Sequence, residues 1–354
     1  MKHVLITGAA GFIGGYTVSE FVQHGWHVLA LVHCNISHNL KIMAEEGSLS
    51  IIHGDITDIP SFEKTLREEI EKRQIKLQAI VHCAGRVSDV GRRRVFKKAN
   101  YESVQHLARL TKELDVDRFI FISSTDVYGL RDFNGESEEE LPLSNNTKNL
   151  YPEFKIKAEE WIHRELPPER FSIIRPAAVW GAGDPTLTPR IVNFLHWSPW
   201  IIHFGKWKGQ NRWPLAHVRN VAAAVFLAAS SPNASGKAIN VLDAEITSID
   251  EFYRILASIY LPNKKFYSIT FPLWLGKMFG QIVSGLSNLL SLNKPFMDPS
   301  LYAIYSVSSH LDFNNNKFKE LLSKANRDVC THEEAIDEII AFRATNSKDH
   351  CVSG

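Results

Sequence analysis

The stretch His3-Val-Leu-Ile-Thr-Gly-Ala-Ala-Gly-Phe-Ile-Gly14 decides the fold of this chain. Its apolar, β-branched beginning predicts a buried strand, and the glycines that follow open a helix-like segment. Gly8 permits a tight turn, Gly11 lets the backbone approach a diphosphate, and Gly14 lets the helix pack closely on the strand. The free N–H groups and the positive dipole end of such a helix face the phosphates. A strand, a glycine-rich turn and a helix in this order therefore predict a dinucleotide-binding site.

The same alternation of short apolar runs and amphipathic stretches continues through the first half of the chain. Strand candidates lie at 3–7, 27–32, 49–53, 78–83, 118–123 and 171–175. Helix-like segments lie at 11–24, 61–74, 93–114 and 152–166. Only strands that are buried on both faces can be apolar on both sides, so this order indicates a parallel sheet covered by helices. We expect a doubly wound α/β fold of the Rossmann type.

The rhythm changes near residue 180, where turn residues cluster and tryptophan becomes frequent. A further strand-and-helix pattern within 213–242 indicates that this part returns to the sheet. We therefore expect a dinucleotide-binding domain over 1–180. A smaller, mostly helical substrate-binding domain is expected over 181–345, followed by a tail at 346–354.

The composition is that of an ordinary globular protein, with 44% hydrophobic and 22% charged residues among 354. Lys and Arg (40) nearly balance Asp and Glu (39), so no overall field is available to recruit nucleic acid. The four cysteines form no C-x-x-C pair, and the N-terminus has the pattern of a strand rather than a signal peptide. His24 and His27 have no carboxylate or cysteine at ligand spacing, so we expect no metal site. We expect a cytoplasmic protein.

The second predicted strand bears on the choice of dinucleotide. Such strands end in an acidic residue when the ribose hydroxyls of NAD are bound, but Val28-Leu-Ala-Leu-Val-His-Cys-Asn35 contains none. A 2′-phosphate would therefore meet no repulsion there, and His33 could contact it, so NADP is mildly favoured over NAD. Asp55 and Ile56, after the third strand, could meet the adenine ring, although Asp55 could equally be a turn or cap residue.

The segment Tyr151-Pro-Glu-Phe-Lys155 carries the candidate chemistry. Positions i and i+4 put the phenol and the ammonium group on one face of a helix, in which Pro152 suits the first turn. A lysine near the phenol, helped by an oxidised nicotinamide, stabilises the phenolate and lowers its pKa. Such a tyrosine can exchange a proton with a substrate oxygen while hydride moves to or from the cofactor.

At this point the sequence resembles the extended short-chain dehydrogenase/reductase family, of the NAD-dependent epimerase/dehydratase type. The motifs that carry the resemblance are T-G-x-x-G-F-I-G at 7–14, G-D-I-T-D at 54–58, V-H-C-A-G at 81–85, Asn100, S-S-T-D-V-Y-G at 123–129, Y-x-x-x-K at 151–155 and I-R-P-x-x-V-W-G at 174–181. The resemblance runs along almost the whole chain.

The resemblance implies a role for each matching residue. Ser124 would hydrogen-bond the substrate oxygen, Tyr151 would be the acid/base, and Lys155 would bind the nicotinamide ribose and tune Tyr151. Asn100 would support the site and a water that relays the proton outwards. The cofactor would further contact Phe12, Ile13, Cys83, Ala84, Gly85 and Pro176. Members of the family often form homodimers through two helices, which would lie here at 93–114 and 152–166.

Two branches of the family compete. Sugar-nucleotide epimerases and dehydratases show G-x-x-x-R-D-F before an H-V-x-D-V strand, and the arginine grips a diphosphate. Here Trp213 takes that position, with Arg212 one residue early, and 209–221 is more similar to the 3β-hydroxysteroid dehydrogenase branch, although Arg219 departs from the usual acidic residue. We predict an NAD(P)-dependent oxidoreductase that interconverts a secondary alcohol and a ketone on a small apolar, sterol-like substrate. The alternatives are a sugar-nucleotide epimerase or dehydratase with tightly bound NAD, and a non-catalytic nucleotide sensor.

A long apolar segment at 272–292 stands apart from these motifs. Its polar residues fall on one narrow stripe at helical spacing, namely Lys277, Gln281, Ser284, Asn288 and Ser291. Three interpretations are open: a membrane-spanning helix, a buried helix that caps the substrate pocket, and a helix that lies at a membrane surface. Lys264 and Lys265, just before the segment, would suit anionic headgroups.

Overall fold

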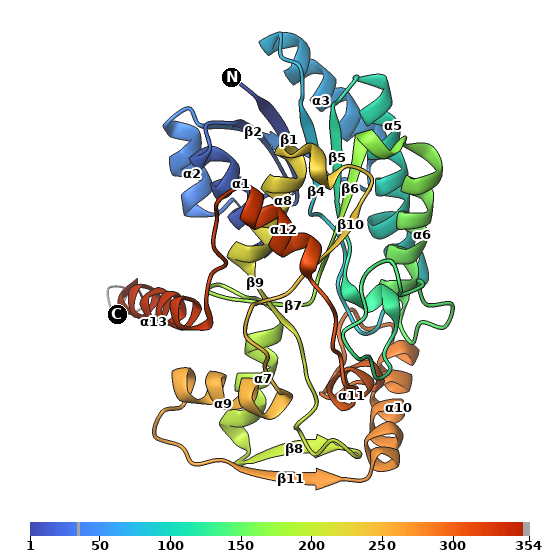
Figure 1. The fold of residues 1–354 in the computed structure, drawn as a ribbon, viewed down its shortest axis with the longest axis vertical. Helices are drawn as coiled ribbons and strands as arrows, with labels where there is room; N and C mark the ends of the chain where they lie inside the picture. The colour runs from blue at the N-terminus through green and yellow to red at the C-terminus, as the bar shows by residue number, and fades with distance from the viewer. Residues whose placement is uncertain (34–35, 350–354) are drawn as a thin grey trace.

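The computed structural model describes residues 1–33 and 36–349 (Figure 1). Its centre is a parallel sheet of seven strands in the order β10-β6-β5-β4-β1-β2-β3. The strands of this sheet are β1 His3–Thr7, β2 His27–Val32, β3 Leu49–His53, β4 Ala79–His82, β5 Arg118–Ile122, β6 Phe171–Pro176 and β10 Ala238–Val241. The fold is therefore the Rossmann-like α/β fold that the alternation of apolar strands and helices predicts.

Helices cover both faces of the sheet. Alternate residues of β1 point to opposite faces, so Val4 and Ile6 belong to one core while Leu5 belongs to the other. The first core includes α1, α2, α8 and α12, and the second includes α3, α5 and α6. The bounds of these helices are α1 Phe12–Gln23, α2 His38–Glu45, α3 Ile59–Arg73, α5 Ser103–Glu113, α6 Leu150–Glu165, α8 Val218–Ser230 and α12 Asn316–Lys324.

The rest of the chain forms a second layer of structure below the carboxyl ends of the strands (Figure 1). It contains two small parallel sheets, β7 with β9 and β8 with β11. Its strands are β7 Ala178–Trp180, β8 Trp200–Phe204, β9 Leu215–His217 and β11 Tyr267–Phe271. Its helices are α7 Leu187–Trp197, α9 Ile249–Tyr260, α10 Leu273–Leu289, α11 Leu301–Ser308 and α13 His332–Asp349. Ligands bind at this edge of open α/β sheets.

Two features of the helices differ from the sequence-based expectations. The single helix expected over 93–114 is divided into α4, Arg93–Lys97, a π-helical turn, Lys98–Glu102, and α5. The turn contains Asn100, whose buried side-chain amide forms two hydrogen bonds with the backbone of Arg86. Helix α2 was not expected, because its sequence is polar and only Leu40 is buried.

The segment at 272–292 also differs from one expectation. Most of it forms α10, but α10 is not the buried helix of the pocket-capping interpretation, because its large apolar side chains are exposed. Within the described residues, no helix is both long enough and apolar enough to cross a membrane. α10 therefore lies on the surface of the protein, and the interpretation of a helix at a membrane surface is taken up below.

Candidate active site

The glycine-rich turn between β1 and α1 has the shape that a phosphate cradle needs. Gly8 has φ +67°, and a Cβ there would lie 2.8 Å from the backbone of Ala84. A Cβ on Gly14 would lie 2.0 Å from the carbonyl oxygen of Gly8. In α1, all of whose residues are described, no side chain caps the N-terminus and no acidic residue occupies the first turn. Its first N–H groups are thus suited to an anionic diphosphate.

The end of β4 is tied to the end of β1 beside this cradle. The Thr7 hydroxyl lies 2.7 Å from Nδ1 of His82, and it accepts a hydrogen bond of 3.3 Å from the N–H of Ala84. Burial lowers the pKa of His82 to about 3, so its ring is neutral at physiological pH. His82 therefore acts as an uncharged link that holds Cys83 and Ala84 against the glycine-rich turn.

Lys155 and Tyr151 lie on the same face of α6, as the sequence predicted. Nζ of Lys155 is 5.7 Å from the centre of the Tyr151 ring and donates a hydrogen bond of 2.6 Å to the carbonyl oxygen of Ile122. Burial lowers the pKa of Lys155 to about 8. α6 begins at Leu150 rather than at 152, because the Asn149 side chain caps it by accepting from the N–H of Tyr151 at 2.8 Å.

The pKa of Tyr151 differs from the expectation. Burial and the charge of Asp126 raise it above its ordinary value, whereas the Ser124 hydroxyl lowers it. Without a bound cofactor, the positive charge of Lys155 does not lower the pKa of Tyr151 enough to offset the effect of burial. The Tyr151 phenol consequently keeps its proton at neutral pH until further positive charge or a substrate oxygen enters the site.

Two residues beside Tyr151 and Ser124 were not predicted from the sequence. Asp126 lies two residues after Ser124, and burial raises the pKa of its carboxyl group. The second is Tyr302 of α11, whose buried hydroxyl interacts with the carboxyl group of Asp126. Burial and the charge of Asp126 raise the pKa of Tyr302. Asp126 falls within the S-S-T-D-V-Y-G motif and could have been noticed, but no local signal connects it with Tyr302.

Asn100 contacts the loop after β4 through its side-chain amide. Its Oδ1 accepts from the N–H of Arg86 at 2.6 Å, and its Nδ2 donates to the carbonyl oxygen of Arg86 at 2.8 Å. A Cβ on Gly85 would lie 3.1 Å from Oδ1 of Asn100 and 3.7 Å from Nζ of Lys155. Gly85 therefore lets the loop pass between these two side chains.

The residues expected near the adenine end of the cofactor are also brought together. Nε2 of His33 lies 3.6 Å from Oδ2 of Asp55, so the ends of β2 and β3 meet. Oδ1 of Asp55 accepts from the N–H of Thr57 at 2.8 Å, as a turn residue does. Ile56 packs at the border of the second core. A carboxylate from the turn after β3 thus lies beside the end of β2, where a 2′-phosphate was expected to meet no negative charge.

The remaining cofactor candidates lie at the same edge of the sheet. Phe12 and Ile13 form the first turn of α1, and Pro176 ends β6. Pro176 is paired with Val241 of β10 in the parallel ladder. Cys34 of the second strand's motif lies outside the described residues.

A buried ion pair anchors α6 to the sheet behind the catalytic candidates. Nε of Arg175, on β6, lies 3.1 Å from Oε1 of Glu159, and a second guanidinium nitrogen lies 2.5 Å from Oε2. A third contact, of 2.7 Å, joins Arg175 to the hydroxyl of Tyr128. Because Glu159 lies one turn beyond Lys155, this pair holds the helix that carries Tyr151 and Lys155 at a fixed distance from β6.

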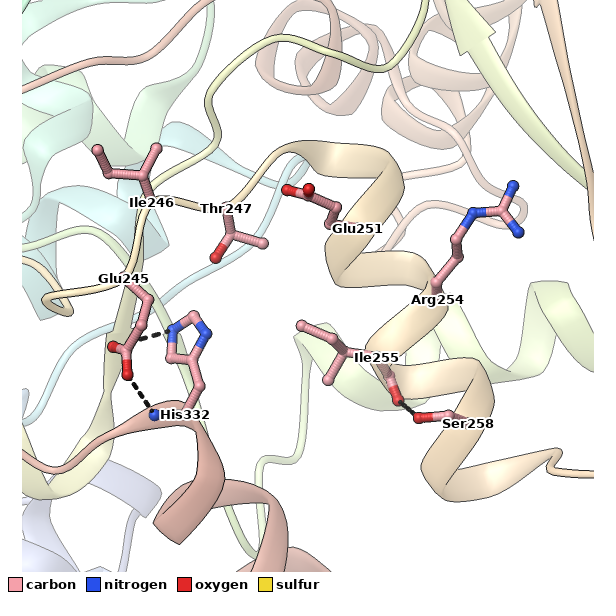
Figure 2. Close-up of a pocket in the computed structure, with 8 residues that line it drawn as sticks. All are labelled: Glu245, Ile246, Thr247, Glu251, Arg254, Ile255, Ser258 and His332. Atoms are coloured by element: carbon pink, nitrogen blue, oxygen red, sulfur yellow. Dashed lines mark hydrogen bonds and ion pairs between the residues drawn. The ribbon is translucent and has the colours of Figure 1, made fainter.

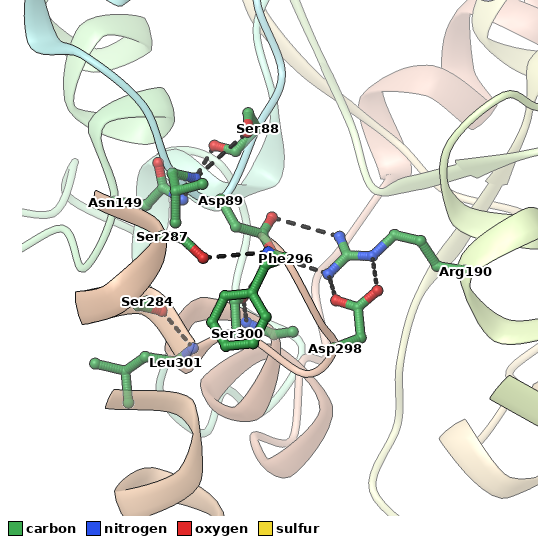
Figure 3. A network of polar contacts seen from close by, with 12 residues as sticks. Ser88, Asp89, Asn149, Arg190, Ser284, Ser287, Phe296, Asp298, Ser300 and Leu301 are labelled. Carbon is green, nitrogen blue, oxygen red and sulfur yellow. Dashed lines mark hydrogen bonds and ion pairs between the residues drawn. The ribbon is translucent and has the colours of Figure 1, made fainter. Parts of the chain in front are cut away.

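A polar network joins the loop after β4 to the second layer of structure (Figure 3). Asp89, in the loop after β4, accepts a hydrogen bond of 2.5 Å from Ser300 and one of 2.8 Å from Arg190. Arg190 also pairs with Asp298, its Nε lying 3.1 Å from Oδ2. Two carboxylates therefore neutralise this arginine, which lies on α7 in the second layer.

A separate hollow of about 460 Å³ lies between α9 and the start of α13 (Figure 2). Its wall includes Glu245, Arg254 and His332, and Oε1 of Glu245 accepts from the N–H of His332 at 2.9 Å. None of the candidate catalytic residues lines this hollow. It is consequently not part of the site described above.

Comparison with known proteins gives the family. A sequence profile of the NAD dependent epimerase/dehydratase family matches residues 4–241. The 3 beta-hydroxysteroid dehydrogenase/Delta 5-->4-isomerase of Mycobacterium tuberculosis is 26% identical over 263 residues, which cover 72% of this chain and 68% of that protein. The UDP-glucose 4-epimerase of Vibrio cholerae is 25% identical over 298 residues, covering 79% of this chain and 82% of that protein.

Solved structures agree in fold. The dTDP-glucose 4,6-dehydratase of Bacillus anthracis, solved in complex with NAD, has a TM-score of 0.70 at 18% identity, with 98% of each chain covered. This chain belongs to the NAD dependent epimerase/dehydratase family. The resemblance found in the sequence is confirmed, and with it an enzyme that uses a cofactor of the NAD(P) type.

Proposed function

We propose that this enzyme interconverts a secondary alcohol and a ketone on an apolar substrate, with sterol-like molecules as the leading class. The observation that carries the proposal is the charge beside the Tyr151 phenol. Asp126 adds negative charge there and Asp89 in turn acts on Asp126, while Arg190, the cation that contacts Asp89, is shared between Asp89 and Asp298. A neutral, apolar substrate suits these surroundings better than a doubly charged diphosphate does.

The proposed roles follow from the contacts. A nicotinamide cofactor held by the glycine-rich turn, Ala84 and Gly85 would supply the acceptor or donor of a hydride. In the oxidising direction Ser124 orients the substrate hydroxyl and Tyr151 takes its proton. Lys155 supplies positive charge 5.7 Å from the Tyr151 ring, which favours the phenolate. Asn100 positions the loop that carries Gly85, so we assign it a positioning role.

The residues at the position where epimerases bind a diphosphate make other contacts here. Arg212 forms an ion pair with Asp312, and Trp213, at the position of the arginine in epimerases, is buried. Nε1 of Trp213 donates to the hydroxyl of Ser306, at 3.2 Å. These contacts support an apolar substrate in the same way as the sequence of 209–221 did.

The test compares Tyr151→Phe with wild-type protein and with Tyr267→Phe, an exposed tyrosine on β11. Nicotinamide absorbance is followed in detergent with NAD or NADP and a panel of 3-hydroxysteroids, long-chain hydroxyketones and UDP- and dTDP-sugars. We expect net reduction of cofactor by an apolar alcohol, at least about 100-fold slower in Tyr151→Phe, with nucleotide affinity unchanged. Equal loss of turnover and of nucleotide binding would contradict the assigned role.

The second candidate is a sugar-nucleotide epimerase or dehydratase, which the similarity to the Vibrio cholerae and Bacillus anthracis enzymes favours. It predicts that a sugar nucleotide is converted without net reduction of added cofactor. It also predicts that NAD remains bound through purification. Either result, without turnover of any apolar alcohol in the panel, would replace our proposal with this one.

A further inference from the structure

Helix α10 presents its large apolar side chains to solvent. Trp274, Met278, Ile282, Leu286 and Leu289 recur every third or fourth residue, and all are exposed. Trp274 is 63% exposed and Leu289 79%. A surface helix of a globular protein usually turns such a stripe inward, so this arrangement is the reverse of the ordinary one.

The small residues on the opposite face of α10 explain why its large apolar residues are exposed. The residues buried there are small or short: Gly276, Gly280, Val283 and Ser287. A Cβ on Gly280 would lie 2.7 Å from the backbone of Leu301, at the start of α11, so the two helices are in close contact. The inward face of α10 therefore has no room for large residues. The large apolar residues are exposed although the helix packs closely against the protein.

The exposed apolar face continues onto the small sheet beside α10. β11 leads directly into α10 through Pro272 (Figure 1). Tyr267 is paired with Trp200 of β8, their ring centres 5.6 Å apart, and Trp200, Tyr267 and Phe271 are all exposed. Alternate residues share one face of a strand, so these rings lie together. We call the exposed apolar residues of β8, β11 and α10 the apolar platform.

The charge of this part of the chain has a single sign. Residues 252–297, which include β11 and α10, contain five basic residues and no Asp or Glu. Residues 185–242, which include β8, also contain no acidic residue. Lys265, before β11, and Lys294, after α10, are both exposed. Asp250 does contact β8 and β11, but it is buried and paired with His203 and Arg254. An apolar face flanked by the exposed Lys265 and Lys294 is complementary to anionic lipid headgroups.

We propose that the apolar platform docks on an anionic membrane surface, with α10 lying in the plane of the interface. The proposal does not rest on the proposed reaction, because it concerns a face on which no catalytic candidate lies. The aromatic rings of β8, β11 and Trp274 would occupy the headgroup level, where amphipathic rings are favoured, and the aliphatic side chains of α10 would reach the acyl chains.

The docked face is joined by hydrogen bonds to the loop after β4. Ser284 and Ser287 of α10 accept hydrogen bonds from the N–H groups of Leu301 and Phe296, at 3.0 and 3.2 Å (Figure 3). In the connection between α10 and α11, the carbonyl oxygen of Asn293 accepts from Arg86 and Ser88, in the loop that passes Asn100. The connection between α10 and α11 therefore links the docked face to the loop that Asn100 contacts.

Cosedimentation of the full-length protein with vesicles tests the proposal. The vesicles are phosphatidylcholine alone or with 30% phosphatidylglycerol, and the variants are the double change Met278→Glu with Ile282→Glu, and Ile246→Glu as the control. Ile246 is an apolar residue as exposed as those of α10, but it lies in the hollow of Figure 2. We expect the double variant to lose at least about tenfold in partitioning, and the control none.

The charge requirement and the competing occupant are tested with the same protein. Lys265→Glu with Lys294→Glu should lower binding to the anionic vesicles by roughly tenfold or more, and added salt should do the same. Equal binding by wild type and the α10 double variant would overturn the proposal, as would no binding by wild type. Sedimentation velocity without lipid completes the test: self-association that the α10 variant abolishes, with no vesicle binding, would assign the platform to a second copy of the chain.

Discussion

Lys155 offers a sharp prediction, because a catalytic charge that is buried should reduce the stability of the fold. Its pKa falls from an ordinary 10.5 to about 8, mainly through burial. Each tenfold change in proton affinity is about 1.4 kcal/mol, so the charged side chain costs the folded protein about 3 kcal/mol at pH 7. Lys155→Met removes the charge in a similar shape and loses a hydrogen bond to Ile122 worth about 1 kcal/mol. We therefore expect Lys155→Met to be about 2 kcal/mol more stable than wild type at pH 7, and inactive.

The pH dependence distinguishes this cause from better packing. Because the folded pKa lies below the unfolded one, the penalty is full below pH 8 and declines as pH rises towards 10.5. The advantage of Lys155→Met should thus nearly vanish by pH 9.5. The assay is urea unfolding followed by far-UV circular dichroism at pH 7 and 9.5, with Lys157→Met, an exposed lysine of the same helix, as the control. A variant less stable than wild type at pH 7, or an advantage that does not change with pH, would refute the reasoning.

Three further changes test other parts of the structure. Glu159→Gln leaves the buried Arg175 without its partner and should lower the free energy of unfolding by about 3–5 kcal/mol, measured by urea unfolding; a loss below 1 kcal/mol would contradict it. Gly14→Ala places a Cβ 2.0 Å from the Gly8 carbonyl oxygen and should weaken NAD binding, measured by calorimetry, at least about tenfold; unchanged affinity would show that the turn is not the cradle. Asp55→Asn removes the carboxylate beside His33 and should raise kcat/KM for NADP relative to NAD by roughly fivefold; an unchanged ratio would place the 2′-position elsewhere.

Parts of the site that depend on neighbours in the sequence could be predicted from the sequence. The turn from Gly8 to Gly14 requires only one strand end and one helix start, and a Cβ on Gly14 would meet Gly8 itself. Tyr151 and Lys155 share a face because an α-helix repeats every 3.6 residues. The strands of the first half follow from their own apolar runs, and most of their bounds agree to within a residue.

Parts that join distant segments could not be predicted. Asp126 faces Tyr302, and Arg190 meets both Asp89 and Asp298, across separations of about 100–180 residues. The π-helical turn at Asn100 forms because its amide finds the backbone of Arg86, which periodicity does not reveal. The prediction that the pKa of Tyr151 is lowered was wrong for the same reason, since the burial that raises this pKa depends on elements outside α6.

The sequence by itself determined the α/β order, the glycine-rich turn and the pairing of Tyr151 with Lys155, because each is an interaction within a few residues of backbone. The tertiary structure alone decided which side of α10 faces solvent. The pattern of α10 shows small residues on one face and large apolar residues on the other, and either face could in principle be inside. α11 packs against the small face because helices approach most closely there, and this leaves the large side chains exposed.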